Sequence, residues 1–394
     1  MELAQELVRV EVAWAGPAKL TCPECGLEGP RYDARRREWR HLDMCQGKTI
    51  LEADVPRVKC PEHGVRQGKV PWAEAGSGFT ALFECVVIDR LKEASITAVG
   101  VQLRMSWDEV DGIMERAVRR GLARRTAVAP ERVGIDETPF QQRHEYVTVV
   151  VDLDDGKVLY VGDDRKRGSL DAFDEGIGEA GRKRIPAVAM DMWKPYIAST
   201  RAHVPEADGK IAFDKFHVAA LLGKAVDTVR RQEHRALSAA GDARLAKTRH
   251  LWLTNPERMS EEHWKGRFRQ LRASTLKTAR AWAIKEEAMG LRWYGERAWA
   301  RKAWRAWLGW ASRSRLEPVL KAARTVRDHL WGILNAIVLG ATNAMGESVN
   351  AGIQRVKRMA CGFRNRDRFR RAVYFHLARL DLYPFLPPVT HTDS

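Results

Sequence analysis

Residues 132–162 read RVGIDETPFQQRHEYVTVVVDLDDGKVLYVG, and this stretch decides the fold class. An apolar run precedes one carboxylate, Asp136, which stands just before a proline turn, so we expect Asp136 to end a strand. The two apolar runs that follow are joined by DLDDGK, which is the signal of a β-hairpin. Farther along, IPAVAMD and KIAFDKF are short apolar stretches separated by helical segments. The alternation predicts an α/β domain.

Acidic residues follow several of these predicted strands. Asp191, in IPAVAMDMWKPY, also stands before a Pro-containing break, and ligands of α/β sheets gather where strands end. Carboxylates on neighbouring strands suit Mg²⁺ or Mn²⁺, and two such ions can assist phosphoryl transfer. Taken singly, Asp136 and Asp191 also fit ordinary polar turns. Asp214 and His217, in IAFDKFHV, are expected either to support the metal ligands from behind or to have no role.

A third acid is expected at such a site, and Glu347 in ATNAMGESVNAGIQRVKRMACGFRN is the strongest choice. It opens a helix whose buried stripe is predicted at Ile353, Val356 and Ala360, which leaves Glu347 at the N-terminal end of that helix. The exposed side of the helix carries three basic residues suited to DNA phosphates: Arg355, Lys357 and Arg358.

Paired cysteine and histidine residues near the N-terminus predict a metal site. The pairs lie in TCPECGLEG and KCPEHGVRQG, and their spacing matches tetrahedral zinc bound by Cys22, Cys25, Cys60 and His63. Cys45 lies in the same segment and could replace His63, although the paired spacing favours His63. Four ligands leave no open position, so the ion would be structural and would stabilise a small module over residues 1–75.

Residues 76–128 contain helical stretches that resemble a helix-turn-helix unit. Ser106 and Glu109 form a capping-box pattern at the start of the last helix. A buried face is then predicted at Val110, Ile113, Met114 and Ala117. The predicted DNA contacts on the same helix are Arg116, Arg119 and Arg120. The alternative is an ordinary helical linker domain.

Composition restricts the class of protein. The 394 residues carry a formal net charge of +16, which favours a polyanionic partner such as nucleic acid. A hydrophobic content of 45% excludes global disorder. There is no apolar run of about 18 residues that would predict a transmembrane helix. Six cysteines without a secretion signal predict reduced thiols and a cytoplasmic protein.

Residues 217–340 are predicted to be helical and are rich in Trp and Arg. The stretch RWYGERAWARKAWRAWLGWASRSR places Trp299, Trp304, Trp307 and Trp310 on one broad helical face. Arginines at four-residue steps lie on another face, at Arg297, Arg301 and Arg305. We interpret the block as a Trp core with a solvated Arg face. The alternative is an Arg stripe along DNA phosphates, with aromatic side chains that stack on bases.

Taken together, these motifs resemble the ISL3 family of bacterial insertion-sequence transposases over nearly the whole chain. The matching stretches are CPECG, WRHLDMCQGKTILEADVPRVKCPEHGV, VGIDETPF, VAMDMWKPY, FDKFHV, TNAMGESVNAGIQRVKRMACGFRN and LDLYP. The resemblance implies a zinc-binding module, a helix-turn-helix domain and an RNase H-like core with a large helical insertion. It also implies a DDE triad, which by position is Asp136, Asp191 and Glu347.

The resemblance also implies a function. Such an enzyme binds terminal inverted repeats, cleaves a DNA strand with Mg²⁺ and transfers the 3′-hydroxyl to target DNA. Its expected partners are both DNAs and a second copy of itself, in a homodimer or higher oligomer, within the bacterial cytoplasm at the nucleoid. The alternatives are a catalytically inactive DNA-binding regulator and a nuclease that cuts with zinc. The predicted parts are 1–75, 76–128, 129–216, 217–340 and 341–394, in which the core is split around the insertion.

Overall fold

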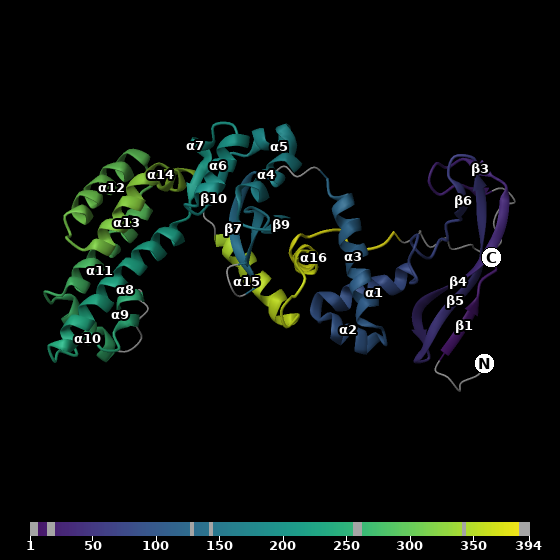
Figure 1. Cartoon of the computed structure of the whole chain (residues 1–394), viewed down its shortest axis with the longest axis horizontal. Helices are drawn as coiled ribbons and strands as arrows, with labels where there is room; N and C mark the ends of the chain where they lie inside the picture. Colours follow the sequence, from purple (N-terminus) through teal and green to yellow (C-terminus); the bar gives the residue numbers. More distant parts are fainter. Residues whose placement is uncertain are drawn as a thin grey trace. The chain divides into compact units, whose positions relative to one another are not determined.

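The computed structural model describes residues 7–13, 20–126, 130–141, 145–254, 262–340 and 344–385 (Figure 1). The chain divides into two compact units. The first combines Met1–Thr126 with Arg355–Ser394, and the second is Ala127–Gln354. Helix α15 (Ala344–Met359) contributes residues to both units.

The sheet of the first unit is built around one long strand. The sheet contains β1 (Leu7–Glu11), β4 (Arg31–Met44), β5 (Gly47–Cys60) and β6 (Gly64–Gln67). β2 (Leu20–Thr21) and β3 (Glu28–Gly29) form a short separate hairpin. β5 pairs with β1 in parallel and with β4 and β6 antiparallel. Trp39 and Val55 are buried in this sheet, and the Trp39 ring meets Trp72 edge to face at 5.5 Å. The sheet therefore has a small apolar core of its own.

The helices of the first unit begin at polar caps. They are α1 (Ala81–Glu93), α2 (Ile96–Leu103), α3 (Trp107–Arg124) and α16 (Arg366–Leu377), and α16 packs on α3. The capping box predicted at the start of α3 is confirmed, because the Glu109 carboxylate accepts the Ser106 N–H at 2.7 Å. The predicted apolar stripe of α3 is also buried, at Val110, Ile113, Met114 and Ala117.

A mixed sheet forms the base of the second unit, in the order β11-β10-β7-β8-β9. The strands are β7 (Arg132–Gln141), β8 (Glu145–Asp152), β9 (Lys157–Val161), β10 (Ala187–Met190) and β11 (Ile211–Phe213). β7, β10 and β11 are parallel, whereas β8 runs antiparallel to β7 and β9. The connecting helices are α4 (Arg167–Gly176), α5 (Gly178–Arg184), α6 (Lys194–His203) and α7 (Ala207–Lys210). The predicted hairpin and the α/β class are confirmed.

A bundle of helices separates β11 from α15 in the sequence (Figure 1). It contains α8 (Lys215–Ala239), α9 (Arg249–Leu253), α10 (Glu262–Arg272), α11 (Lys277–Gly290), a 3₁₀ turn (Leu291–Trp293), α12 (Arg297–Ser312), α13 (Glu317–Asp328) and α14 (Leu330–Leu339). α14 packs closely on β11. Glycine at position 332 permits this approach, since a Cβ atom there would lie 2.5 Å from the Phe213 ring. Buried apolar residues of the sheet and of this bundle form one continuous hydrophobic core.

Two expectations about helix faces are partly wrong. Of the four tryptophans on α12, Trp304 and Trp307 are buried, whereas Trp299 and Trp310 are 58% and 39% exposed. The apolar stripe of α12 is therefore narrower than a face that holds all four tryptophans. On α15 the predicted stripe at Ile353 and Val356 is buried, but Ala360 lies beyond the end of the helix and is exposed.

Candidate active site and zinc centre

Three aspartates form a row across the parallel strands of the second unit. Ala189 of β10 lies opposite Gly134 of β7 and Ala212 of β11. The residue two positions after each of these three is an aspartate, namely Asp136, Asp191 and Asp214. Neighbouring strands lie about 4.8 Å apart, so the row brings three carboxylates to one edge of the sheet. Asp214 occupies a place equivalent to that of the two predicted metal ligands.

Asp136 does not end its strand, so that prediction is wrong. β7 continues past Asp136 to Gln141, and Asp136 lies near its middle. In the described register, β7 pairs with β10 only as far as Gly134, whereas its pairing with β8 extends from Val133 to Gln141 with an irregularity after Pro139. Pro139 is tolerated here because proline, which has no N–H, is accommodated where a strand is paired on one side. Asp191 and Asp214 directly follow the last residues of β10 and β11, as predicted.

Burial and mutual repulsion raise the pKa of acids in the row. The pKa of Asp191 rises to about 6, because burial disfavours its charge and the carboxylates of Glu137 and Asp136 repel it, while His217 opposes the rise. Burial also raises the pKa of Asp214, which is 2% exposed, with a further contribution from Asp136. A divalent cation would relieve this repulsion, and carboxylate oxygens suit a hard ion. The residues present therefore fit the metal that the sequence predicts.

Backbone N–H groups donate to all three of these carboxylates. Asp136 Oδ1 accepts the Glu137 N–H at 2.7 Å. Asp191 Oδ1 accepts the Trp193 N–H at 3.1 Å. Asp214 Oδ1 accepts the Phe216 N–H at 3.1 Å and so caps α8. His217 Nε2 lies 3.9 Å from Asp214 Oδ2, which places this imidazole at the same edge of the sheet. Asp214 and His217 therefore both lie at the aspartate row, and their supporting role stays a prediction.

Helix α15 is attached to the row through Asn350. Its side-chain amide donates to Asp136 Oδ2 at 2.7 Å, and Gln354 Nε2 donates to Thr138 Oγ1 at 3.3 Å. Glu347 lies one turn before Asn350 on the same side of the helix, and it is exposed. Sequence reasoning missed Asn350, although its spacing from Glu347 was a usable signal. Among the described residues, the acids do not form a group of three ligand atoms that all lie within 4.8 Å of one another.

The predicted zinc ligands come together in the first unit. The Sγ atoms of Cys22, Cys25 and Cys60 and a ring nitrogen of His63 all lie within 4.8 Å of one another. Cys25 Sγ is 3.6 Å from Cys60 Sγ, and Cys60 Sγ is 3.7 Å from His63 Nδ1. Zinc–sulfur bonds of about 2.3 Å in a tetrahedron give ligand separations of about 3.8 Å. The donor set and its spacing therefore fit zinc.

Local structure explains why each ligand pair faces the same point. A glycine in the left-handed region follows each pair, with φ of +75° at Gly26 and +70° at Gly64, and it turns the chain back. His63 presents Nδ1 to the sulfurs, while its Nε2 lies 3.5 Å from the Glu24 carboxylate. A carboxylate behind a metal-binding imidazole fixes its orientation. Cys45, the alternative ligand, is exposed in the turn between β4 and β5 and lies outside this group.

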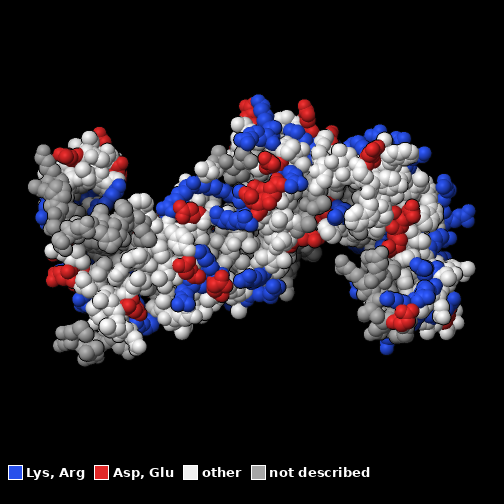
Figure 2. Space-filling view, turned by 180° about the vertical axis from the view of Figure 1, so that it is seen from behind, with Lys and Arg blue, Asp and Glu red and all other residues white. Residues whose placement is uncertain are grey.

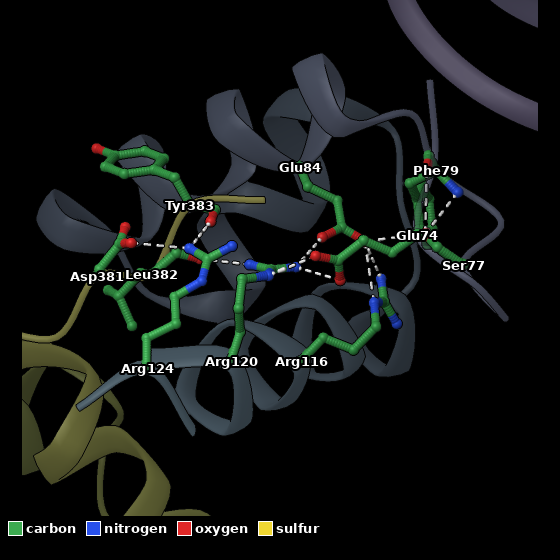
Figure 3. A network of polar contacts seen from close by, with 10 residues as sticks. All are labelled: Glu74, Ser77, Phe79, Glu84, Arg116, Arg120, Arg124, Asp381, Leu382 and Tyr383. Atoms are coloured by element: carbon green, nitrogen blue, oxygen red, sulfur yellow. Dashed lines mark hydrogen bonds and ion pairs between the residues drawn. The ribbon is translucent and has the colours of Figure 1, made fainter. Parts of the chain in front are cut away.

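Two of the three arginines predicted to contact DNA on α3 form ion pairs inside the protein instead (Figure 3). Glu84, which is 1% exposed, accepts hydrogen bonds from Arg116 at 2.7 Å and from Arg120 at 2.9 Å. Arg120 also pairs with Glu74 at 2.7 Å, and its side chain is only 8% exposed. The guanidinium groups of Arg116 and Arg120 are therefore engaged by acids within the protein and do not project to DNA as predicted. Arg119 lies on the exposed side of α3 and stays a predicted contact.

This network makes adjacent arginines respond differently to substitution. Arg120→Ala leaves Glu84 buried with fewer partners, so we expect the free energy of unfolding to fall by about 3 kcal/mol. Arg119→Ala is the matched control, because it removes an equal charge from the exposed side of the same helix. It should lower affinity for DNA ends while leaving the urea midpoint within error. Equal urea midpoints for the two variants would contradict the assignment.

The basic residues of α15 differ in exposure. Arg355 and Arg358 are exposed, as predicted. Lys357 is half-buried with its ammonium 6.0 Å from the Phe369 ring centroid, and burial lowers its pKa, so its prediction as an exposed residue is wrong. Figure 2 shows Lys and Arg side chains spread over the face in view, with Asp and Glu interspersed among them. On that face, positive and negative side chains alternate and do not form a single basic patch.

Comparison with known families follows the same order of parts. A DDE-type family model of the ISL3 group, described as a transposase, matches residues 133–373. The zinc finger of the transposases IS204/IS1001/IS1096/IS1165 matches residues 19–63, and the helix-turn-helix domain of transposase family ISL3 matches residues 69–118. These matches define the class of protein, a DNA-cleaving and DNA-transferring enzyme of the DDE type. The chain belongs to the ISL3 family of insertion-sequence transposases.

Curated relatives extend over most of the chain. The transposase for insertion sequence element IS1557 of Mycobacterium tuberculosis is 29% identical over 373 residues, in a match that covers 87% of this chain and 82% of that protein. The transposase for insertion sequence element IS1001 of Bordetella parapertussis is 27% identical over 355 residues, in a match that covers 89% of this chain and 87% of that protein. Within the described residues, helices long and apolar enough to cross a bilayer are absent.

Proposed function

We propose that this chain cleaves DNA at the terminal inverted repeats of its insertion sequence in a Mg²⁺-dependent reaction, and then joins the freed strand to target DNA. The observation that carries the proposal is the aspartate row of Asp136, Asp191 and Asp214 at one edge of the sheet. Attachment of α15 to Asp136 supports it, because this helix also carries Glu347.

The roles of the residues follow from their contacts. Asp136 and Asp191 would hold the divalent ions, and Glu347 would complete the set of ligands. Bound ions supply Lewis-acid activation of the attacking hydroxyl and charge stabilisation at the leaving oxygen. Asn350 orients Asp136 by donating to one of its oxygens. Asp214 and His217 would support the ligands by setting the local charge.

The remaining parts would serve recognition and assembly. The zinc module of residues 1–75 and the helix-turn-helix of residues 76–128 would bind the inverted repeats, with Arg119, Arg355 and Arg358 as DNA contacts. Residues 129–216 and the part of α15 that precedes Arg355 would form an RNase H-like core, and residues 217–340 its helical insertion. The remainder of the predicted last part, Arg355–Ser394, belongs to the first compact unit. Joining two element ends needs two active chains, so we propose a homodimer or larger oligomer on DNA.

The test uses the purified full-length chain and duplexes that carry the inverted repeats flanking its gene. We expect strand cleavage at the end of the element with Mg²⁺ or Mn²⁺, and none in EDTA. Selective removal of zinc, followed by addition of Mg²⁺, separates this proposal from a nuclease that cuts with its zinc site. Cutting that follows zinc would overturn the proposal. End binding without cutting under every metal condition would favour the inactive regulator.

A further inference from the structure

A basic loop and a partly exposed indole border the aspartate row. β9 is antiparallel to β8, which is antiparallel to β7, so β9 ends at the same edge of the sheet as β7, β10 and β11. The loop after β9 carries Arg165 and Lys166. Trp193 follows Asp191 by two residues and arrives at this edge from β10. Cationic and aromatic side chains therefore meet beside the acids.

Trp193 is held firmly, yet the residue is partly exposed. Its backbone N–H donates to Asp191 at 3.1 Å, and its indole Nε1 donates to the Arg165 carbonyl at 3.1 Å. The polar end of the indole is thus satisfied within the protein. The residue is nevertheless 37% exposed, whereas large aromatic side chains usually bury most of their surface.

Arg165 packs between two aromatic rings at this edge. Its guanidinium carbon lies 5.1 Å from the centroid of the Trp193 ring and 4.8 Å from that of Tyr146. The same guanidinium is 3.4 Å from Glu137, the residue after Asp136. An indole has two faces, and Arg165 lies over one of them. The exposed surface of Trp193 can therefore accept a second flat group.

The loop that carries Arg165 is fixed before any ligand arrives. Asp164 Oδ1 accepts the Lys166 N–H at 2.8 Å and the Ser169 hydroxyl at 2.7 Å. The Asp164 carbonyl accepts the Thr148 hydroxyl, which is also 3.0 Å from the Tyr196 hydroxyl. Because these side chains are already ordered, binding of a ligand costs less conformational entropy.

We propose that Trp193, supported by Arg165, stacks on an unpaired DNA base next to the scissile phosphate, while Lys166 contacts the strand's backbone. The inference rests on the proposed function, because it takes the aspartate row as the cleavage site. A base is the flat group that a nucleic-acid strand offers, and stacking on tryptophan is tolerant of sequence. The nearby cations complement the phosphates, and Lys166 has a side chain that is 82% exposed.

The test is photo-cross-linking with 5-iodouracil placed in turn at each nucleotide near the element's end. The full-length chain is used in EDTA, so the result does not depend on cleavage. We expect one position to cross-link to Trp193. Trp193→Ala should lose that cross-link, and Trp193→Phe should keep part of it. Trp299→Ala is the matched control, since Trp299 is an exposed tryptophan of the helical bundle, and it should cross-link like the unchanged protein.

Cleavage by the same variants gives an independent readout. With Mg²⁺, we expect Trp193→Ala to lower the cleavage rate roughly tenfold, with partial rescue by Trp193→Phe. Unchanged cross-linking and rate in Trp193→Ala, at an unchanged melting temperature, would overturn the stacking proposal. Absence of any cross-link from Trp193 in the unchanged protein would do the same. A cross-link without cleavage by the unchanged protein would instead overturn the proposed function and leave the stacking assignment standing.

Discussion

Asp191→Asn is expected to lower the rate of Mg²⁺-dependent end cleavage by about a thousandfold, which corresponds to ~4 kcal/mol of lost transition-state stabilisation. The substitution keeps the size of the side chain and the acceptor for the Trp193 N–H, but it removes the charge at the centre of the aspartate row. Binding of the DNA ends should change little. Strand cleavage on labelled duplexes and end binding by mobility shift measure the two properties separately.

Asp155→Asn is the matched control for this substitution. Asp155 lies in the β8–β9 hairpin, its side chain is 54% exposed, and it pairs with Lys157. Loss of this carboxylate should leave cleavage within about twofold, because it removes a charge from a polar turn and not from the row. Wild-type cleavage by Asp191→Asn, or equal losses in the two variants, would contradict the assignment of Asp191.

Stability gives the same prediction a second readout. A folded-state pKa of about 6 lies above the usual value for aspartate, so the folded protein binds this proton more tightly than the unfolded chain does. Stability contributed by Asp191 therefore falls as the pH rises from about 4 to 6, and at neutral pH the buried charge is a cost. In EDTA at pH 7, Asp191→Asn should melt at or above the wild-type temperature. Mg²⁺ should raise the wild-type melting temperature more than that of the variant.

Sequence patterns predict best where the chemistry is local. The zinc ligands stand in two short motifs that each form a turn, so spacing alone identified Cys22, Cys25, Cys60 and His63. The α3 capping box is also a contact between residues three positions apart. Within each ligand pair and within the capping box the residues are close in the sequence, although Cys25 and Cys60 themselves lie 35 residues apart.

Long-range contacts account for most of what the sequence could not predict. From the sequence alone, the arginines of α3 resemble DNA contacts. Only the folded structure shows that Glu74 and Glu84, which precede that helix in the sequence, form ion pairs with two of them. The place of Asp214 in the row depends on the pairing of β10 with β11, which a run of three apolar residues does not reveal. Tertiary packing likewise decided which tryptophans of α12 are buried.

Cys60→Ser is expected to remove the zinc and to unfold the part of the first unit that surrounds it. The apolar cluster at the site contains little besides the ligands themselves, namely Leu20 and Val58. Structural zinc contributes about 10–16 kcal/mol in small zinc domains, and these few apolar contacts cannot replace that amount. We expect the stretches 20–30 and 60–67 to lose protection in hydrogen exchange. The β4–β5 hairpin should keep its protection, because it packs around the separate core of Trp39 and Val55.

Cys45→Ser provides the control that the chain itself offers. Cys45 lies within the same 1–75 segment but is exposed in the β4–β5 turn, outside the ligand group. This variant should retain one zinc per chain, measured by elemental analysis, and bind DNA ends normally. Cys60→Ser should lose the metal and most end binding, because the zinc module is proposed to contact the inverted repeats. Zinc retained by Cys60→Ser, or lost by Cys45→Ser, would show that the ion has other ligands. Retention of full end binding after zinc loss would move DNA recognition to the helix-turn-helix alone.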